Sequence, residues 1–270
     1  MRILSALVAV ALLVSVYIYF STTGLFYICI LAALKGILEF NKMAFNDTPH
    51  SLVKKLLFPV FGFTLLIISV YYAQYSSEFW ALLLSLYLCL YIWLYGSKKS
   101  NDWLFFNLTK SAIGFFYVIL LPVMALKTLE LHYGETWFLL LLLIVFCGDT
   151  FAYFGGLKFG KKPLSQSLSP KKTLEGSYFG FLGSSCASLA VGLIKFPTVN
   201  PLYFVVLGLI AGLFAQTGDL FESLIKRIAQ VKDSGSIMPG HGGVLDRVDG
   251  VLFASPIVYL FAFNTEKFLF

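Results

Sequence analysis

Charged residues are scarce in this sequence, and their scarcity argues against a soluble globular protein. Only 13% of the 270 residues are Asp, Glu, Lys or Arg, whereas soluble domains average about a quarter. Hydrophobic residues make up 59% of the chain, and the mean hydropathy is +0.83. So few charges cannot cover this much apolar surface in water. We therefore expect the lipid bilayer to be the solvent of most of the chain.

Cysteine motifs and a nucleic-acid-binding surface are missing as well. The four cysteines all lie within apolar runs without a C-x-x-C spacing. This pattern argues against a zinc site or a disulfide framework and predicts small buried side chains. The net charge of +6 is not gathered into a basic stripe with interleaved aromatic residues. Basic residues that flank membrane spans explain it better and suit an anionic lipid surface, so we expect no nucleic-acid partner.

Long apolar runs stand in place of these features. A membrane-spanning helix needs roughly 20 apolar residues. About nine runs approach that length, which predicts an all-α, polytopic integral membrane helix bundle with about nine transmembrane helices. The first run follows Arg2 without an A-x-A cleavage site, so we expect a retained helix and not a signal peptide. The predicted spans are about 3–20, 23–40, 56–74, 79–96, 111–130, 137–156, 176–195, 201–220 and 250–268.

The basic residues predict the orientation of the chain in the membrane. If the N-terminus is cytoplasmic, sixteen of the twenty Lys and Arg residues fall on the inner side. Lys127, Lys195 and Lys267 then fall outside, and Lys35 lies within a span. Cytoplasmic segments of membrane proteins carry such an excess. We expect an integral protein of a bacterial inner (plasma) membrane, with a cytoplasmic N-terminus and an active site on the cytoplasmic side.

One charged pair lies within a span of the N-terminal half. Lys35 and Glu39 are four residues apart, a spacing that favours an ion pair on a helix. We interpret them as a self-neutralised pair near the cytoplasmic end of the span. A role in lipid entry is the alternative.

An acidic residue and a glycine-containing loop follow in the C-terminal half. Asp149 lies several residues inside the sixth predicted span. An ionisable side chain there is costly, so a function is the first hypothesis and an ion pair with a lysine of the bundle is the alternative. The segment from Gly155 to Lys161 approaches a phosphate-binding P-loop. Lys162 replaces the Ser or Thr of that motif and a membrane helix precedes it, so we reject this interpretation.

The segment 169–176 predicts a turn that leads into a helix. Its sequence is S-P-K-K-T-L-E-G, in which Thr173 is a candidate N-cap. Lys171 and Lys172 would attract phosphate groups near the N-terminus of that helix. A basic loop that only sets the membrane topology is the alternative.

The segment 219–249 carries a dense group of charges between two apolar spans. If the preceding helix continues, then Asp219, Glu222, Ser223 and Lys226 share one face. Carboxylate and hydroxyl oxygens are ligands that magnesium accepts, and Lys226 and Arg227 would bind phosphate. These residue types predict a metal and phosphate site. A solvated charged loop is the alternative.

Glycines and a second pair of acidic residues complete this segment. Pro239-Gly240-His241-Gly242-Gly243 is incompatible with ordinary helix, and its glycines let the backbone approach an anion closely. Asp246 and Asp249 follow, with Arg247 between them. Metal-binding acids, phosphate-binding cations and a glycine cradle are the parts that phosphoryl or nucleotidyl transfer needs.

At these residues the sequence resembles a known family, the phosphatidate cytidylyltransferases or CDP-diacylglycerol synthases. Asp149-x2-Ala152-Tyr153 and the segment 169–176 are similar to a second conserved region of that family. The main pattern is Ser223-x2-Lys226-Arg227-x4-Lys232-Asp233-x-Gly235-x3-Pro239-x-His241-Gly242-Gly243-x2-Asp246-Arg247-x-Asp249. The resemblance covers about residues 145–250.

The resemblance implies an integral membrane enzyme that condenses CTP with phosphatidic acid. Its products would be CDP-diacylglycerol and pyrophosphate, with Mg²⁺ required and a second cation left open. Metal ligands would be Asp219 and Asp246, to which the shared helix face adds Glu222. Catalytic candidates are Lys226, Arg227, Lys232, Asp233, His241, Arg247 and Asp249. Substrate-binding candidates are Asp149, Ser169, Lys171, Lys172, Thr173, Glu175, Ser223, Gly242 and Gly243.

The chain then divides into two regions of different roles. Residues 1–130 would form an N-terminal group of about five spans. Residues 131–270 would form a C-terminal catalytic region of about four spans, with cytoplasmic loops 157–175 and 221–249. The partners would be CTP, phosphatidic acid and membrane lipid, and a homodimer stays open.

Two other enzymes, a transporter and a scaffold protein are the alternatives to this function; a scaffold would give no reason to place Asp219, Asp246 and Asp249 around a glycine-rich loop. Asp246-x2-Asp249-Gly250 begins like the motif of CDP-alcohol phosphotransferases, but Phe253-Ala254 stands where Ala-Arg should follow. A CTP-dependent lipid or polyprenol kinase stays open and would differ in its products. A phospholipid transporter would be expected to show two repeated halves with broken helices, and no such repeat is found.

Overall fold

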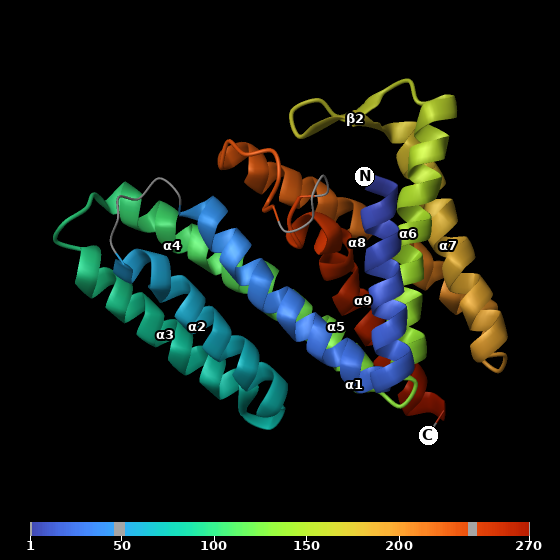
Figure 1. Ribbon diagram of the computed structural model, residues 1–270, viewed down its shortest axis with the longest axis horizontal. Helices are drawn as coiled ribbons and strands as arrows, with labels where there is room; N and C mark the ends of the chain where they lie inside the picture. Colours follow the sequence, from blue (N-terminus) through green and yellow to red (C-terminus); the bar gives the residue numbers. More distant parts are fainter. Residues whose placement is uncertain (1, 46–51, 237–241, 270) are drawn as a thin grey trace.

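The computed structural model describes residues 2–45, 52–236 and 242–269, and side chains within 15–45, 55–236 and 242–267. Nearly all of the described chain is helical (Figure 1). The elements are α1 (Arg2–Ala44), α2 (Leu52–Tyr71), the 3₁₀ helix η1 (Ala73–Tyr75), α3 (Ser76–Tyr95), α4 (Asn101–Phe115), the π-helix η2 (Phe116–Leu120), α5 (Leu121–Leu129), α6 (Gly134–Phe159), β1 (Pro163–Ser165), β2 (Ser169–Thr173), α7 (Leu174–Lys195), α8 (Pro201–Ile228) and α9 (Leu245–Leu269).

The helices have the length and apolarity of membrane spans. Within the described ranges, seven helical stretches are long and apolar enough to cross a membrane, and Lys55–Tyr71 is a shorter apolar helix. This finding confirms a polytopic helical membrane protein but not the predicted count of nine. The difference lies partly in α1, which contains the first two predicted spans and is bent at Ser21 (φ 52°, ψ −148°). At the bend, Tyr17, Ser21 and Thr22 donate hydrogen bonds to the Glu135 carboxylate.

The all-α prediction is confirmed, and a small antiparallel hairpin is present in addition. Strands β1 and β2 pair within the loop that follows α6, with Pro163 opposite Thr173 and Ser165 opposite Ser169. In Figure 1 the hairpin extends sideways from the upper end of α6. The strands are too short to show the alternation of apolar and polar residues that identifies a strand in sequence. The hairpin leads directly into α7 and places the segment 169–173 in extended conformation.

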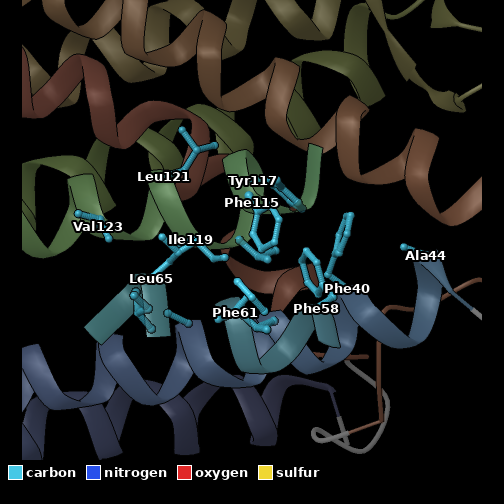
Figure 2. Close-up of a cluster of buried hydrophobic side chains, with 14 of the residues drawn as sticks. Phe40, Ala44, Phe58, Phe61, Leu65, Phe115, Tyr117, Ile119, Leu121 and Val123 are labelled. Atoms are coloured by element: carbon cyan, nitrogen blue, oxygen red, sulfur yellow. The ribbon is translucent and has the colours of Figure 1, made fainter. Parts of the chain in front are cut away.

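An aromatic core joins the N-terminal helices. Phe40 of α1 packs beside Phe58 of α2, with ring centroids 5.5 Å apart, and Phe58 stacks on Phe115 of α4 at 4.9 Å. Figure 2 shows these rings gathered between α1, α2 and the α4–η2 segment. Gly114 leaves the space that the rings of Phe40 and Phe58 occupy. The packing fixes the rotation of α1 about its own axis.

A second core joins α6, α8 and α9, and α9 belongs to both. Leu245 and Leu252 of α9 are buried in the N-terminal core, whereas Val251 and Ala254 are buried in the second core. Small residues bring α6, α7 and α8 close together, as is usual between membrane helices; for example, Ser184 of α7 donates to the Ile144 carbonyl at 2.8 Å. The start of α9 is thus held between the two halves of the molecule.

Candidate active site

The predicted site residues come from helix ends that lie on one side of the molecule. The last turns of α6, the hairpin, the last turns of α8 and the start of α9 all lie toward the same end in Figure 1. Two cross-element ion pairs tie them together. Lys172 of β2 pairs with Asp219 of α8, and Lys226 of α8 pairs with Asp246 of α9. Residues of the hairpin, of α8 and of α9 therefore lie together at this end.

The pair between Lys172 and Asp219 lies at the open edge of this site. Their side chains are 33% and 31% exposed, so both stay accessible. Asp149 of α6 is exposed and interacts electrostatically with both Lys172 and Asp219. The N-cap prediction at Thr173 is confirmed, because its hydroxyl accepts a hydrogen bond from the Gly176 N–H at 3.1 Å. This cap sets where β2 ends and where Lys172 points.

The Lys226 ammonium lies between two carboxylates. Its Nζ is 2.6 Å from Glu222 Oε2 and 2.7 Å from Asp246 Oδ1. The Glu222 side chain is only 1% exposed. Helix α8 continues to Ile228, so the shared helix face that the spacing of these residues predicted is present. Lys226 balances charges that would otherwise be too costly to bury together.

Asp246 organises the loop that precedes α9. Its Oδ2 accepts hydrogen bonds from the Ser234 N–H at 2.7 Å, the Ser234 hydroxyl at 2.8 Å and the Gly243 N–H at 2.8 Å. Gly242 has φ +81°, and an added Cβ would collide with the Asp246 carboxylate. Glycine is therefore required at position 242 both for its backbone conformation and for the space that the carboxylate fills.

Asp249 completes the acidic group. It lies one turn after Asp246 and accepts a hydrogen bond from the Gly250 N–H at 2.7 Å. Its carboxyl interacts electrostatically with Asp219 and Glu222. The site thus contains more carboxylates than lysines.

The donor chemistry of this group fits a divalent cation. Glu222 Oε1 is buried and has no hydrogen-bond partner among the described residues, so one hard oxygen remains available. Among those residues, no three acidic, histidine or cysteine side chains already surround a common point. Mg²⁺ is usually held by one or two carboxylates together with substrate phosphates and water. An excess of carboxylates without a closed protein cage matches that requirement.

The other predicted residues take different positions. Glu175 accepts hydrogen bonds from the Lys161 and Lys162 N–H groups, at 2.9 and 3.2 Å, and so closes the base of the hairpin. Ser223 is half-buried on α8, and Ser169 pairs with Ser165 in the hairpin. His241, with Pro239 and Gly240, lies outside the described residues. Lys171, Arg227, Lys232, Asp233 and Arg247 are exposed.

Sequence reasoning missed two residues that contact this site, Ser234 and Glu39. Ser234 is buried and falls on a variable position of the pattern. Glu39 of α1 is also buried and accepts hydrogen bonds from the segment 234–245. The ion pair predicted between Lys35 and Glu39 is wrong. The ion pairs of the described residues all lie elsewhere. A buried acid within a span was the available signal.

Comparisons with known proteins agree with this geometry. The model of the cytidylyltransferase family matches residues 1–264. Phosphatidate cytidylyltransferase 5, chloroplastic, from Arabidopsis thaliana is 40% identical over 186 residues, which cover 58% of this chain and 45% of that protein. A phosphatidate cytidylyltransferase of Thermotoga maritima is 39% identical over 165 residues, 57% of each chain. One from Rickettsia felis is 33% identical over 177 residues, 62% of this chain and 77% of that protein.

The extent of these matches differs between the family model and the individual proteins. The chain spans about half the length of the Arabidopsis and Thermotoga relatives that it matches, whereas the family model covers almost all of it. The chain belongs to the cytidylyltransferase family, as the resemblance of its motifs to phosphatidate cytidylyltransferases predicted.

Proposed function

We propose that this protein transfers the cytidylyl group of CTP to phosphatidic acid, forming CDP-diacylglycerol and pyrophosphate. The convergence of Lys172, Asp219, Lys226 and Asp246 from two distant segments carries the proposal. Both substrates are polyanions, and the reacting phosphate is already anionic at neutral pH. The site therefore has to neutralise and position charge, which is most of what nucleotidyl transfer requires.

The lysines and the acidic residues have distinct roles in this proposal. Lys172 lies at the accessible edge, where it can exchange Asp219 for a substrate phosphate. Lys226 lies deeper and balances the transferred phosphate while Glu222 and Asp246 keep it in place. No side chain has to remove a proton from the attacking oxygen. His241 would donate a hydrogen bond or anchor the loop, and Arg227, Lys232 and Arg247 would attract the substrates.

Asp219 and Asp246 would hold Mg²⁺, with Glu222 available through its unpartnered Oε1. When bound, Mg²⁺ would neutralise charge on the phosphate oxygens that attack and leave. A second cation is compatible with the excess of carboxylates. Without a cation and substrates, the negative charge of these acids has to be balanced in another way. The ammonium groups of Lys172 and Lys226 balance it by pairing with them.

We also propose nine membrane crossings and a cytoplasmic N-terminus. The bend at Ser21 divides α1 into two legs that diverge in Figure 1, and the helices that follow alternate between two ends of the molecule. The hairpin, the end of α8 and the start of α9 share one end, and the last turns of α5, α7 and α9, which carry Lys127, Lys195 and Lys267, lie toward the other. This distribution supports a cytoplasmic site in a bacterial inner membrane. Phosphatidate would enter sideways from the inner leaflet, and a homodimer is compatible with this arrangement.

Product analysis tests this proposal directly. Purified protein in detergent is incubated with CTP, Mg²⁺ and phosphatidate, and the products are identified by mass spectrometry. We expect lipid-bound cytidine and one pyrophosphate per lipid formed, with neither product when phosphatidate is omitted. CDP together with a newly phosphorylated lipid, formed when a diacylglycerol or polyprenol replaces phosphatidate, would instead identify a CTP-dependent kinase, the remaining candidate.

A further inference from the structure

Glu39 is a buried carboxylate that the proposed chemistry does not use. It lies in α1, about 200 residues from the charged segment in sequence, and its residue is only 3% exposed. Its Oε1 accepts a hydrogen bond from the Val244 N–H at 3.1 Å, and its Oε2 accepts one from the Leu245 N–H at 3.0 Å. Its Oε2 also lies 3.2 Å from the Ser234 hydroxyl. A carboxylate from one half of the molecule therefore caps a helix of the other half.

These contacts hold the start of α9 in place. The first N–H groups of a helix have no partner within the helix, and a negative charge near them is stabilising. Glu39 satisfies the N–H groups of Val244 and Leu245, and the next residue is Asp246. Ser234 lies within hydrogen-bonding distance of both the Asp246 and the Glu39 carboxylates. The position of the Asp246 carboxylate is thus coupled to Glu39 through the helix start and through one shared hydroxyl.

Two glycines of the family pattern leave room for Glu39. A Cβ added to Gly235 would lie 2.5 Å from Glu39 Oε1, and one added to Gly243 would lie 2.5 Å from Glu39 Oε2. Real Cβ atoms do not approach other atoms so closely. Residues 234–235 and 243–245 therefore pack around a side chain from α1; at position 243 an added Cβ would meet the Ser234 hydroxyl as well as Glu39.

Packing on both sides prevents Glu39 from turning away. One turn before it, an added Cβ on Gly36 would lie 3.0 Å from Leu245, so α1 lies directly against the start of α9. The residue after it, Phe40, is 2% exposed and locked in the aromatic core that Figure 2 shows. The Glu39 side chain is therefore held with its carboxylate directed at the Val244 and Leu245 N–H groups.

We propose that Glu39 is a positioning residue of the active site, which acts through the start of α9 to orient Asp246 and Lys226. The proposal rests on the proposed function, because it assigns Glu39 a role in that reaction. It gives the N-terminal helices a specific part in the chemistry, because α1 supplies the carboxylate that caps the start of α9. Removing its charge should misplace the Asp246 carboxylate that would bind Mg²⁺, while leaving that carboxylate present.

The test compares Glu39→Gln and Glu39→Asp with Glu266→Gln. Glu266 is a matched control, because its carboxylate also accepts two backbone N–H groups, those of His132 and Tyr133 at 2.9 and 2.8 Å, near the opposite end of α9. For each variant we would measure thermal unfolding, kcat, KM for both substrates and the Mg²⁺ concentration that gives half-maximal CTP binding. In Glu39→Gln, an amide NH₂ group replaces one carboxylate oxygen and then faces the N–H group of Val244 or Leu245, which is also a donor.

We expect Glu39→Gln to lower kcat, or to raise the half-maximal Mg²⁺ concentration, by about 10- to 100-fold, as replacement of a residue that supports a metal ligand does. KM for phosphatidate should stay within about threefold, and Glu39→Asp should recover part of the loss because it keeps the charge. Glu266→Gln should leave the kinetics unchanged, and its loss of thermal stability should be smaller because the Glu266 hydrogen bonds are exposed whereas Glu39 is buried.

Equal kinetics for Glu39→Gln and wild type would overturn the proposal. It would also be overturned if Glu39→Gln and Glu266→Gln both lost activity in proportion to their loss of thermal stability. If Glu39→Gln fails to fold, Glu39→Asp against Glu266→Gln gives the same decision. A wild-type protein that binds CTP with Mg²⁺ but forms no CDP-diacylglycerol would refute the proposed reaction alone. The Mg²⁺ dependence of CTP binding would still decide the role of Glu39.

Discussion

Asp219 and Asp246 are both proposed metal ligands, yet their surroundings predict losses of stability of very different size when each is replaced. The Asp246 side chain is 8% exposed and pairs with Lys226, which is 15% exposed. Its other oxygen accepts three further hydrogen bonds from Ser234 and Gly243. Asp219 has one ion pair, with Lys172, and both side chains are about one-third exposed. Replacing each with Asn separates a structural role from a catalytic one.

The expected magnitudes follow from these contacts. In Asp246→Asn, either orientation of the amide places an NH₂ group against Lys226 or against the donors of Ser234 and Gly243. A hydrogen bond to a charged group is worth about 1.5–3 kcal/mol, so a loss of roughly 2–4 kcal/mol is expected. At about 2–4 °C per kcal/mol for a chain of this size, Tm should fall by roughly 4–16 °C. An accessible ion pair contributes about 0–1 kcal/mol, so Asp219→Asn should change Tm by no more than about 4 °C.

Activity should respond differently from stability. Both variants should lose at least about 100-fold in turnover, because charge stabilisation by a metal ion is worth several kcal/mol. Thermal unfolding of detergent-purified protein, followed by tryptophan fluorescence, and formation of lipid-bound cytidine measure the two effects. Near-normal turnover in Asp219→Asn would refute its assignment as a metal ligand. Equal Tm losses in the two variants would refute the structural distinction.

Three further predictions follow from single contacts. Lys172→Ala should raise KM for CTP about tenfold, equivalent to about 1.4 kcal/mol, with little change in Tm. Steady-state kinetics at varied CTP concentration measures KM, and an unchanged value would contradict the proposal that Lys172 binds a phosphate of CTP. Gly243→Ala should cost about 1–3 kcal/mol and lower kcat, because its Cβ would meet the Ser234 hydroxyl and Glu39. Thermal unfolding and turnover should show a smaller loss for Gly62→Ala, whose Cβ would lie 3.2 Å from Ile119, and equal losses in the two variants would contradict this reasoning. Thr173→Ala should cost about 1 kcal/mol as a lost N-cap, measured by thermal unfolding, whereas Thr173→Ser should match wild type; equal losses in both would exclude the cap.

The local features of the site were predictable from sequence because they depend on neighbouring residues. The positions of Asp219, Glu222 and Lys226 predicted a shared helix face, and α8 does continue through them. Thr173 was predictable as an N-cap for the same reason, since the bond to Gly176 spans three residues.

Contacts between distant segments were not predictable in this way. Spacing along one helix suggested that Lys35 pairs with Glu39, but the partners of Glu39 are N–H groups about 200 residues away. The hairpin was missed because the strands β1 and β2 are too short to show a pattern. The sequence showed that glycine occupies positions 235 and 243. It did not show why, because Glu39 comes near these positions only in the folded protein.

The central claim is that the chain transfers a cytidylyl group to phosphatidate. It is tested most directly by following where the α-phosphate and the γ-phosphate of CTP go during the reaction. Two parallel reactions would contain wild-type protein, Mg²⁺ and phosphatidate, one with CTP labelled at the α-phosphate and one with CTP labelled at the γ-phosphate. We predict that the α label enters the lipid and that the γ label leaves as pyrophosphate. A γ label in the lipid, with the α label in free CDP, would contradict the claim and identify a kinase.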